Sequence, residues 1–173
     1  METRFRDTET WRAVDSFNHA PEAELRPLLA ECLAVPRWVD AVVAGRPYPS
    51  LDALLAASSA AAQGLSDAEV LGAIAGHPRI GERQRTGGVS ASWSRSEQSG
   101  VDSSQADRLA AANAAYEDRF GHIYLVCATG LSGAQMLDDL ASRLHNPPET
   151  ELRVVNEELA KIAALRLQKL IGS

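Results

Sequence analysis

Only two cysteines, Cys32 and Cys127, occur in the 173 residues, and their wide separation fits no metal-ligand spacing. One such pair does not make a disulfide framework, so a reducing compartment is favoured. No apolar stretch approaches the ~18 residues that would span a bilayer. The charged start, METRFRDTET, lacks the apolar run of a signal peptide, and LIGS at 170–173 is no peroxisomal or retention address. We therefore expect a cytoplasmic protein without a membrane partner.

A basic block is also missing. The chain has 17 lysines and arginines against 23 acidic residues, a net charge of −6, and its arginines are scattered. Surfaces that bind nucleic acid usually carry a basic excess or patch, so no nucleic-acid partner is expected. The sequence has no P-loop and no G-x-S-x-G nucleophile elbow. His19, His122 and His145 show no metal-ligand spacing with one another or with the cysteines.

Glycine and proline divide most of the chain into segments of helical composition. Pro36 suits the first turn of a helix, and Gly45 is expected to end that helix in a left-handed conformation. Serine caps open three other helices, two of them as capping boxes with a Glu or Gln three residues later. The expected helices are 51–63 after Ser50, 67–75 after Ser66 with Glu69, about 103–120 before Gly121, 134–144 after Ser132 with Gln135, and about 149–170 after Pro148.

One segment departs from this composition. Residues 122–129, HIYLVCAT, are rich in aromatic and β-branched side chains, which favours a strand. No partner strand is evident, and a lone strand leaves its edges unsatisfied. We expect a buried extended segment or part of a helix, in which Cys127 is a packed thiol rather than a nucleophile. No repeat or linker divides the chain, so a single domain over 1–173 is expected, with residues 1–10 as a flexible tail.

A polar, Gly/Ser-rich stretch covers residues 81–105, and a connection of this length in a compact domain is usually functional or disordered. Thr86-Gly87-Gly88 indicates a flexible loop, and a short helix is expected around 93–98. On that helix Ser94, Glu97 and Gln98 would share one face. Because S-x-x-E is also the capping-box signature, the pattern fits either a helix cap or a site for a small polar ligand.

His77 directly follows an expected helix end, within AGHPRIGE at 75–82. It could interact with the dipole and the last carbonyls of that helix. It could equally be a general acid or base, because histidine titrates near neutrality. Pro78 restricts His77 to extended backbone and so fixes the direction of the imidazole, which suits a catalytic group.

Arg166 continues an apolar stripe of the last expected helix. An arginine in such a place is unusual unless it is paired or its head reaches water. It fits either a snorkelling side chain near a helix end or a clamp for an anionic ligand, to which a planar guanidinium is suited. The apolar residues that precede it on the stripe are Leu152, Val155, Leu159 and Ile162.

Six stretches together form a more specific pattern. They are FNHA at 17–20, LLAECLAVPRWVDAVVAGRPYPSLDALL at 28–55, HPRIGE at 77–82, SRSEQSGV at 94–101, YEDRFGHIYLVCATGLS at 116–132 and ETELRVVNEELAKIAALRLQKL at 149–170. In this order they resemble the OHCU decarboxylase family, which acts on 2-oxo-4-hydroxy-4-carboxy-5-ureidoimidazoline in urate degradation. The resemblance covers nearly the whole chain.

The resemblance implies an all-α, single-domain bundle of about seven to nine helices without a sheet, which forms a homodimer. It implies decarboxylation of the ureidoimidazoline to (S)-allantoin by a carboxy-lyase that needs neither cofactor nor metal. It implies catalytic roles for His77, Glu97 and Arg166, with Arg153 a weaker candidate in place of Arg166. The substrate-binding residues that it implies are Pro78, Ser94, Arg95, Ser96, Glu97, Gln98, Tyr124, Leu125, Val126, Cys127 and Ala128.

The chain also departs from the family pattern. Many members follow His-Pro with an acidic residue and Leu-Ala-Gly-Lys, where this chain has Arg79-Ile80-Gly81-Glu82, and many have paired cysteines where it has Cys32-Leu33. The first difference bears on loop contacts and on the substrate. Two other functions therefore stay open: a lyase or hydrolase for a related ureido or imidazoline compound, and a non-catalytic helical interaction module. A scaffold would not need His77, Glu97 and Gln98 together.

Overall fold

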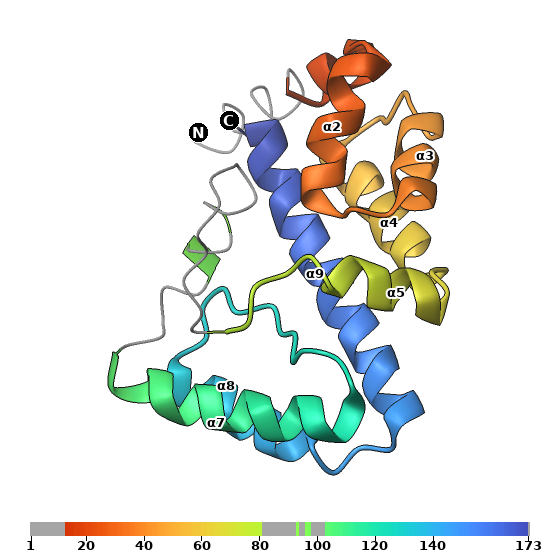
Figure 1. Ribbon diagram of the computed structural model, residues 1–173. Coiled ribbons are helices and arrows are strands. Elements are labelled where there is room, and N and C mark those ends of the chain that lie inside the picture. The colour runs from red at the N-terminus through yellow and green to blue at the C-terminus, as the bar shows by residue number, and fades with distance from the viewer. Residues whose placement is uncertain (1–12, 81–92, 94–95, 98–102, 173) are drawn as a thin grey trace. The chain divides into compact units, whose positions relative to one another are not determined.

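The computed structural model describes residues 13–80, 93, 96–97 and 103–172 (Figure 1). Within these residues the backbone forms helices, turns and extended loops but no strand, which confirms the all-α class. The chain divides into two compact units. The first unit comprises Met1–Leu65 with Ala160–Ser173, and the second comprises Ser66–Leu159.

The first unit contains a helical segment over 13–19 and the helices α2 (Glu22–Cys32), α3 (Pro36–Ala44) and α4 (Leu51–Gln63). It also contains the second half of α9 (Pro148–Gly172). Its core includes a tryptophan of α3 that is fully buried. The indole N–H of this residue, Trp38, donates to the Ser58 carbonyl of α4 at 3.1 Å, so that α3 and α4 are joined by a polar contact inside the core.

The second unit contains α5 (Asp67–Ile74), α7 (Ser103–Phe120), α8 (Gly133–Arg143) and the first half of α9. Its core is aromatic and aliphatic, and two buried tyrosine rings meet edge to face in it, at 5.5 Å between centroids. Among the helices that the structure describes, none is both long enough and apolar enough to cross a bilayer. The core residues are Ile80, Leu109, Tyr116, Tyr124, Val126, Ala128, Met136 and Leu140.

Local signals open the helices as the sequence predicts. Pro36 is the first residue of α3, where its missing N–H costs no intrahelical hydrogen bond. The Ser50 hydroxyl accepts a hydrogen bond from the Ala53 N–H at 3.1 Å. The predicted reciprocal capping boxes are present at Ser66 with Glu69 and at Ser132 with Gln135.

The end of α3 differs from the prediction. Gly45 has a φ of −75°, so the expected left-handed conformation is wrong. Glycine is needed here for space, because a Cβ at this position would overlap the ring and the hydroxyl of Tyr48. Tyr48 is buried, and its hydroxyl donates to the Val42 carbonyl of α3 at 2.7 Å. Gly45 therefore lets the chain fold a tyrosine back onto the helix that it has just left.

Candidate functional site

Residues 123–128 form an extended segment that is neither helix nor strand. From Tyr124 to Ala128 every residue is buried except Cys127, which is half-buried. Two glycines in the left-handed conformation flank the segment: Gly121, with φ 76°, ends α7, and Gly130, with φ 81°, precedes α8. Of the two interpretations of this stretch, the buried extended segment is confirmed and the helix is wrong.

Side chains from two helices bind the backbone of this segment. Arg143 in α8 donates from Nη1 to the Leu125 carbonyl at 2.8 Å. Glu158 in α9 accepts at Oε2 from the Cys127 N–H, also at 2.8 Å. Buried backbone polar groups are almost always paired. These two bonds take the place of a neighbouring strand and explain how a stretch of strand-like composition is accommodated in a helical fold.

Arg143 also belongs to a buried charge cluster. It is 5% exposed, and its Nη2 lies 2.6 Å from Oε1 of Glu151, which is fully buried. The same carboxylate accepts hydrogen bonds from the Tyr116 hydroxyl and the Asn146 amide. Burial by itself would lower the pKa of Arg143, but the hydrogen bond to Glu151 and the charge of that residue raise it above its ordinary value. The guanidinium that holds the Leu125 carbonyl therefore stays charged.

Tyr124 anchors the start of the extended segment. Its hydroxyl donates to Asp139, and its ring centroid lies 4.7 Å from the guanidinium carbon of Arg143. Burial, and then the hydrogen bond to Asp139, raise the pKa of the Tyr124 phenol well above its usual range. This phenol is therefore a packing and hydrogen-bonding group and not an acid catalyst at neutral pH.

His77 begins a short connection that is fastened to α7. The residue lies just beyond α5 and is half-buried. Asn113 in α7 donates from Nδ2 to the Ile80 carbonyl at 3.1 Å. Arg79 forms an ion pair with Glu117 in α7, with 3.1 Å between Nη2 and Oε2, and its hydrogen bond lowers the pKa of the Glu117 carboxyl. These contacts fix the backbone that follows the histidine.

Glu97 is a buried acid. It is 8% exposed and helical, whereas the neighbouring Ser96 is helical and exposed. An acidic side chain buried to this extent normally has a partner or a function. The other predicted site residues of this stretch, and the predicted loop at 86–88, lie outside the described residues. Those site residues are Ser94, Arg95 and Gln98.

Arg166 belongs to the first unit. It is 4% exposed, and its Nη1 donates to the Glu31 carbonyl in the last turn of α2 at 3.3 Å. The interpretation of a snorkelling side chain is therefore wrong, and a cation at this helix end is favoured by the helix dipole. The thiol of Cys32 is buried beside this site, and burial raises its pKa to about 12, although the charge of Arg166 opposes that rise. Arg153, the weaker candidate, is exposed.

The second unit contains His77, the half-buried Pro78, Glu97 and the segment 124–128. Sequence reasoning missed Glu158, which binds that segment. A signal was available: Glu151 and Glu158 are seven residues apart and share one side of α9 with apolar residues. The same observation, a charge on an apolar face, singled out Arg166.

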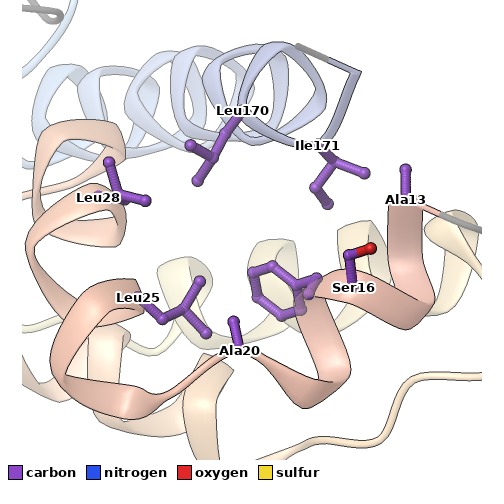
Figure 2. Close-up of a pocket in the computed structure, with 8 residues that line it drawn as sticks. Ala13, Ser16, Ala20, Leu25, Leu28, Leu170 and Ile171 are labelled. Carbon is purple, nitrogen blue, oxygen red and sulfur yellow. The ribbon is translucent and has the colours of Figure 1, made fainter.

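Described residues also line cavities in both units. One, of about 420 Å³, is in the first unit, where Figure 2 shows Leu170 and Ile171 of α9 opposite Leu25 and Ser16. The side chains that line it among the described residues carry one hydroxyl and no charge, which does not suit an amide-rich ligand. The other, of about 330 Å³, lies beside α7 in the second unit. Its lining residues are Arg79, Ile80, Ala106, Ala110, Asn113, Ala114 and Glu117.

None of the predicted catalytic residues His77, Glu97 and Arg166 is among the described lining residues of these two cavities. Within the described ranges, no group of three or more histidine, cysteine or acidic side chains is arranged to hold a metal ion. Within the second unit the candidate site consists of His77, Glu97 and the extended segment at 124–128, and their grouping with Arg166 into one site stays a prediction.

Comparison with known proteins identifies the family. A model of the OHCU decarboxylase family matches residues 18–168. The 2-oxo-4-hydroxy-4-carboxy-5-ureidoimidazoline decarboxylase of Amia calva is 34% identical over 136 residues, which cover 76% of this chain and 78% of that protein. The decarboxylase of the same name from Mus musculus is 34% identical over 138 residues, covering 77% and 78%.

A solved structure is similar as well. The crystal structure of an OHCU decarboxylase in the presence of (S)-allantoin has a TM-score of 0.69 and 25% identity, and the match covers 83% of this chain and 96% of that chain. The family match includes His77, Glu97 and the extended segment at 124–128. This chain belongs to the OHCU decarboxylase family.

Proposed function

We propose that this chain is a carboxy-lyase that converts 2-oxo-4-hydroxy-4-carboxy-5-ureidoimidazoline into (S)-allantoin and CO₂ without a cofactor. The observation that carries the proposal is the family match over residues 18–168, which includes every predicted site residue. The named decarboxylases of Amia calva and Mus musculus support the substrate, and the structure solved in the presence of (S)-allantoin supports the product.

The substrate contains its own electron sink. Its carboxylate is attached to a ring carbon that bears a hydroxyl and adjoins the carbon of a C=N bond. When the bond to the carboxylate breaks, CO₂ leaves, the electron pair forms a C=C bond in the ring, and the former C=N nitrogen takes up a proton. The enol then loses its O–H proton to become a carbonyl while the neighbouring ring carbon gains a proton. The protein has to orient the ring and deliver that proton to one face.

We assign proton delivery to His77. Histidine is the side chain suited to proton exchange near neutrality, and the connection that follows His77 is held by Asn113 and Glu117 of α7. Glu97 would accept a hydrogen bond from the imidazole or from a substrate N–H, a role that its burial supports.

Recognition of the ureido and ring amides is assigned to Ser94, Gln98 and the backbone of 124–128. Arg166 is proposed to bind an anionic or carbonyl oxygen of the substrate, because a planar guanidinium can bind a carboxylate through two parallel hydrogen bonds. Replacement of Arg166 by lysine retains the charge but not this geometry, so kcat/KM should fall in both Arg166→Lys and Arg166→Ala.

The proposal is tested by replacing His77 with asparagine. The unstable substrate is generated enzymatically from urate, and formation of optically active product is followed by circular dichroism. We expect wild-type protein to accelerate the appearance of (S)-allantoin and His77→Asn to lose at least about a hundredfold in kcat, the usual size of an acid–base contribution. His145→Asn, at an exposed histidine, is the matched control.

Near-normal turnover by His77→Asn would remove this residue from the mechanism. No turnover by the wild-type protein, together with activity on another compound of a ureido or imidazoline panel, would replace the proposed substrate. No activity on any member of the panel would favour an interaction module.

We further propose that the chain acts as a homodimer in the cytoplasm and that its two units form one functional domain. The family match, which runs through residues of both units, supports the single domain. Cys32 and Cys127 are not joined in a disulfide, which fits a reducing compartment. Light scattering after size-exclusion chromatography tests the dimer, because its mass would be twice the 18.5 kDa of one chain.

A further inference from the structure

The two side-chain bonds to the extended segment lie on one edge of its backbone. In extended backbone, the N–H and C=O of one residue point to one side, and those of the next residue point to the other. Leu125 and Cys127 are two residues apart, so their backbone groups share an edge. That edge carries the bonds to Arg143 and Glu158.

Val126 presents its N–H and C=O to the opposite edge. Within the part of the chain that the structure describes, no hydrogen bond uses either of these groups, although the residue is only 6% exposed. Buried backbone groups that lack a partner are costly, so this edge is suited to a ligand that satisfies both. An amide or ureido group offers an N–H and a carbonyl side by side, in the way that an added strand pairs with a sheet edge.

We infer that Glu158 is a positioning residue: by holding the Cys127 N–H it fixes the register at which Val126 meets an amide or ureido group of the substrate. The inference rests on the proposed function. In this role Glu158 acts on the substrate through the backbone that it holds, and not by contact with the reacting atoms.

In the positioning role, Glu158 contributes to substrate binding through its acceptor oxygen and not through its charge. Glutamine keeps an acceptor at the same reach, whereas methionine keeps the length and apolar bulk of the side chain without an oxygen. Glu157, the exposed neighbour on α9, provides a control for changes in helix propensity and net charge. The informative set is therefore Glu158→Gln, Glu158→Met and Glu157→Met.

The experiment measures kcat and KM for the ureidoimidazoline together with the hydrogen exchange rate of the Cys127 amide in ¹⁵N-labelled protein. We expect Glu158→Met to raise KM by up to about tenfold, the size expected for loss of one hydrogen bond, with a much smaller change in kcat. Its Cys127 amide should exchange at least about tenfold faster than in the wild type. Glu158→Gln should recover most of both losses, and Glu157→Met should match the wild type.

Wild-type KM in Glu158→Met would overturn the inference while the proposed function stands. An equal loss in Glu158→Gln and Glu158→Met would also overturn it, because the charge would then be what matters. If Glu158→Met speeds hydrogen exchange across the whole second unit rather than at the extended segment, a general loss of stability explains its effect, and the positioning role is overturned. Absence of turnover in the wild type would instead overturn the proposed function, and the exchange rates would still report whether Glu158 holds the Cys127 N–H.

Discussion

Arg143 and Glu151 form an ion pair that is sealed from solvent, with 2.6 Å between Nη2 and Oε1. The pair joins α8 to α9 within the second unit, and the same guanidinium binds the Leu125 carbonyl. The stability of the fold and the geometry of the extended segment therefore depend on one cation.

Replacement of Arg143 by methionine should destabilise the protein by about 3–5 kcal/mol, because the carboxylate of Glu151 would be left buried without its counter-charge. The free energy of unfolding is measured by denaturant titration. The double variant Arg143→Met/Glu151→Leu should lose less than the sum of the two single changes, since it removes both charges. Arg108→Met, at an exposed arginine of α7, should stay within about 0.5 kcal/mol of the wild type. A strictly additive double variant would contradict this account.

Replacement of Gly45 by alanine should destabilise the protein by about 1–3 kcal/mol, because the new methyl group would overlap Tyr48 and force it away from the Val42 carbonyl. Gly72 in α5 is the matched control, since nothing lies within 4 Å of a Cβ placed there. Gly72→Ala should stabilise by roughly 0.5–1 kcal/mol through helix propensity. The measurement is the unfolding free energy of the two variants relative to the wild type, from thermal or denaturant unfolding. If Gly45→Ala stabilised the protein as much as Gly72→Ala, the space occupied by Tyr48 would not be what selects glycine at position 45.

Cys32 should make stability fall at alkaline pH. Burial raises the pKa of this thiol from 9.0 to about 12, so the folded chain retains a proton that the unfolded chain releases between these values. Its contribution is complete below pH 9.0 and is lost as the pH rises toward about 12, because the folded state binds more protons there. The slope approaches about 1.4 kcal/mol per pH unit.

The unfolding free energies of the wild type and of Cys32→Ala are measured from about pH 8 to about pH 11. The difference between them cancels the effect of tyrosine titration, which both proteins share. Iodoacetamide should also alkylate native Cys32 much more slowly than the unfolded chain, since the thiolate is the reactive form. A pH-independent difference, together with rapid alkylation of the native protein, would mean that this thiol is not protected by burial.

Much of the helical framework could be predicted because its signals are local. Ser66 with Glu69 and Ser132 with Gln135 specify their helix starts within four residues, and both capping boxes form. The conformation of Gly45 was beyond local reasoning, because the side chain that needs the space, Tyr48, returns to the helix only through tertiary folding.

The sequence suggested which residues belong to the candidate site, but not which side chains hold the extended segment in place. His77 and Glu97 were singled out from their sequence context and from the resemblance; Glu97 is buried, and the roles of both residues stay predictions. The partners of the extended segment were missed because Arg143 and Glu158 lie 18 and 31 residues away from the backbone groups that they bind. The seven-residue spacing of Glu151 and Glu158 places charges on an apolar face of α9, but it does not show which backbone groups those charges bind.

The way the extended segment is held also bears on self-association. A run such as IYLVCA, at 123–128, has the composition that builds cross-β fibrils when its backbone is exposed. In the native fold, Arg143 and Glu158 bind one edge of the backbone of this hexapeptide, where the same segment of another copy could otherwise pair. A change that detaches α8 or α9 from this segment would expose its backbone, so the contacts from these two helices also protect the chain against aggregation.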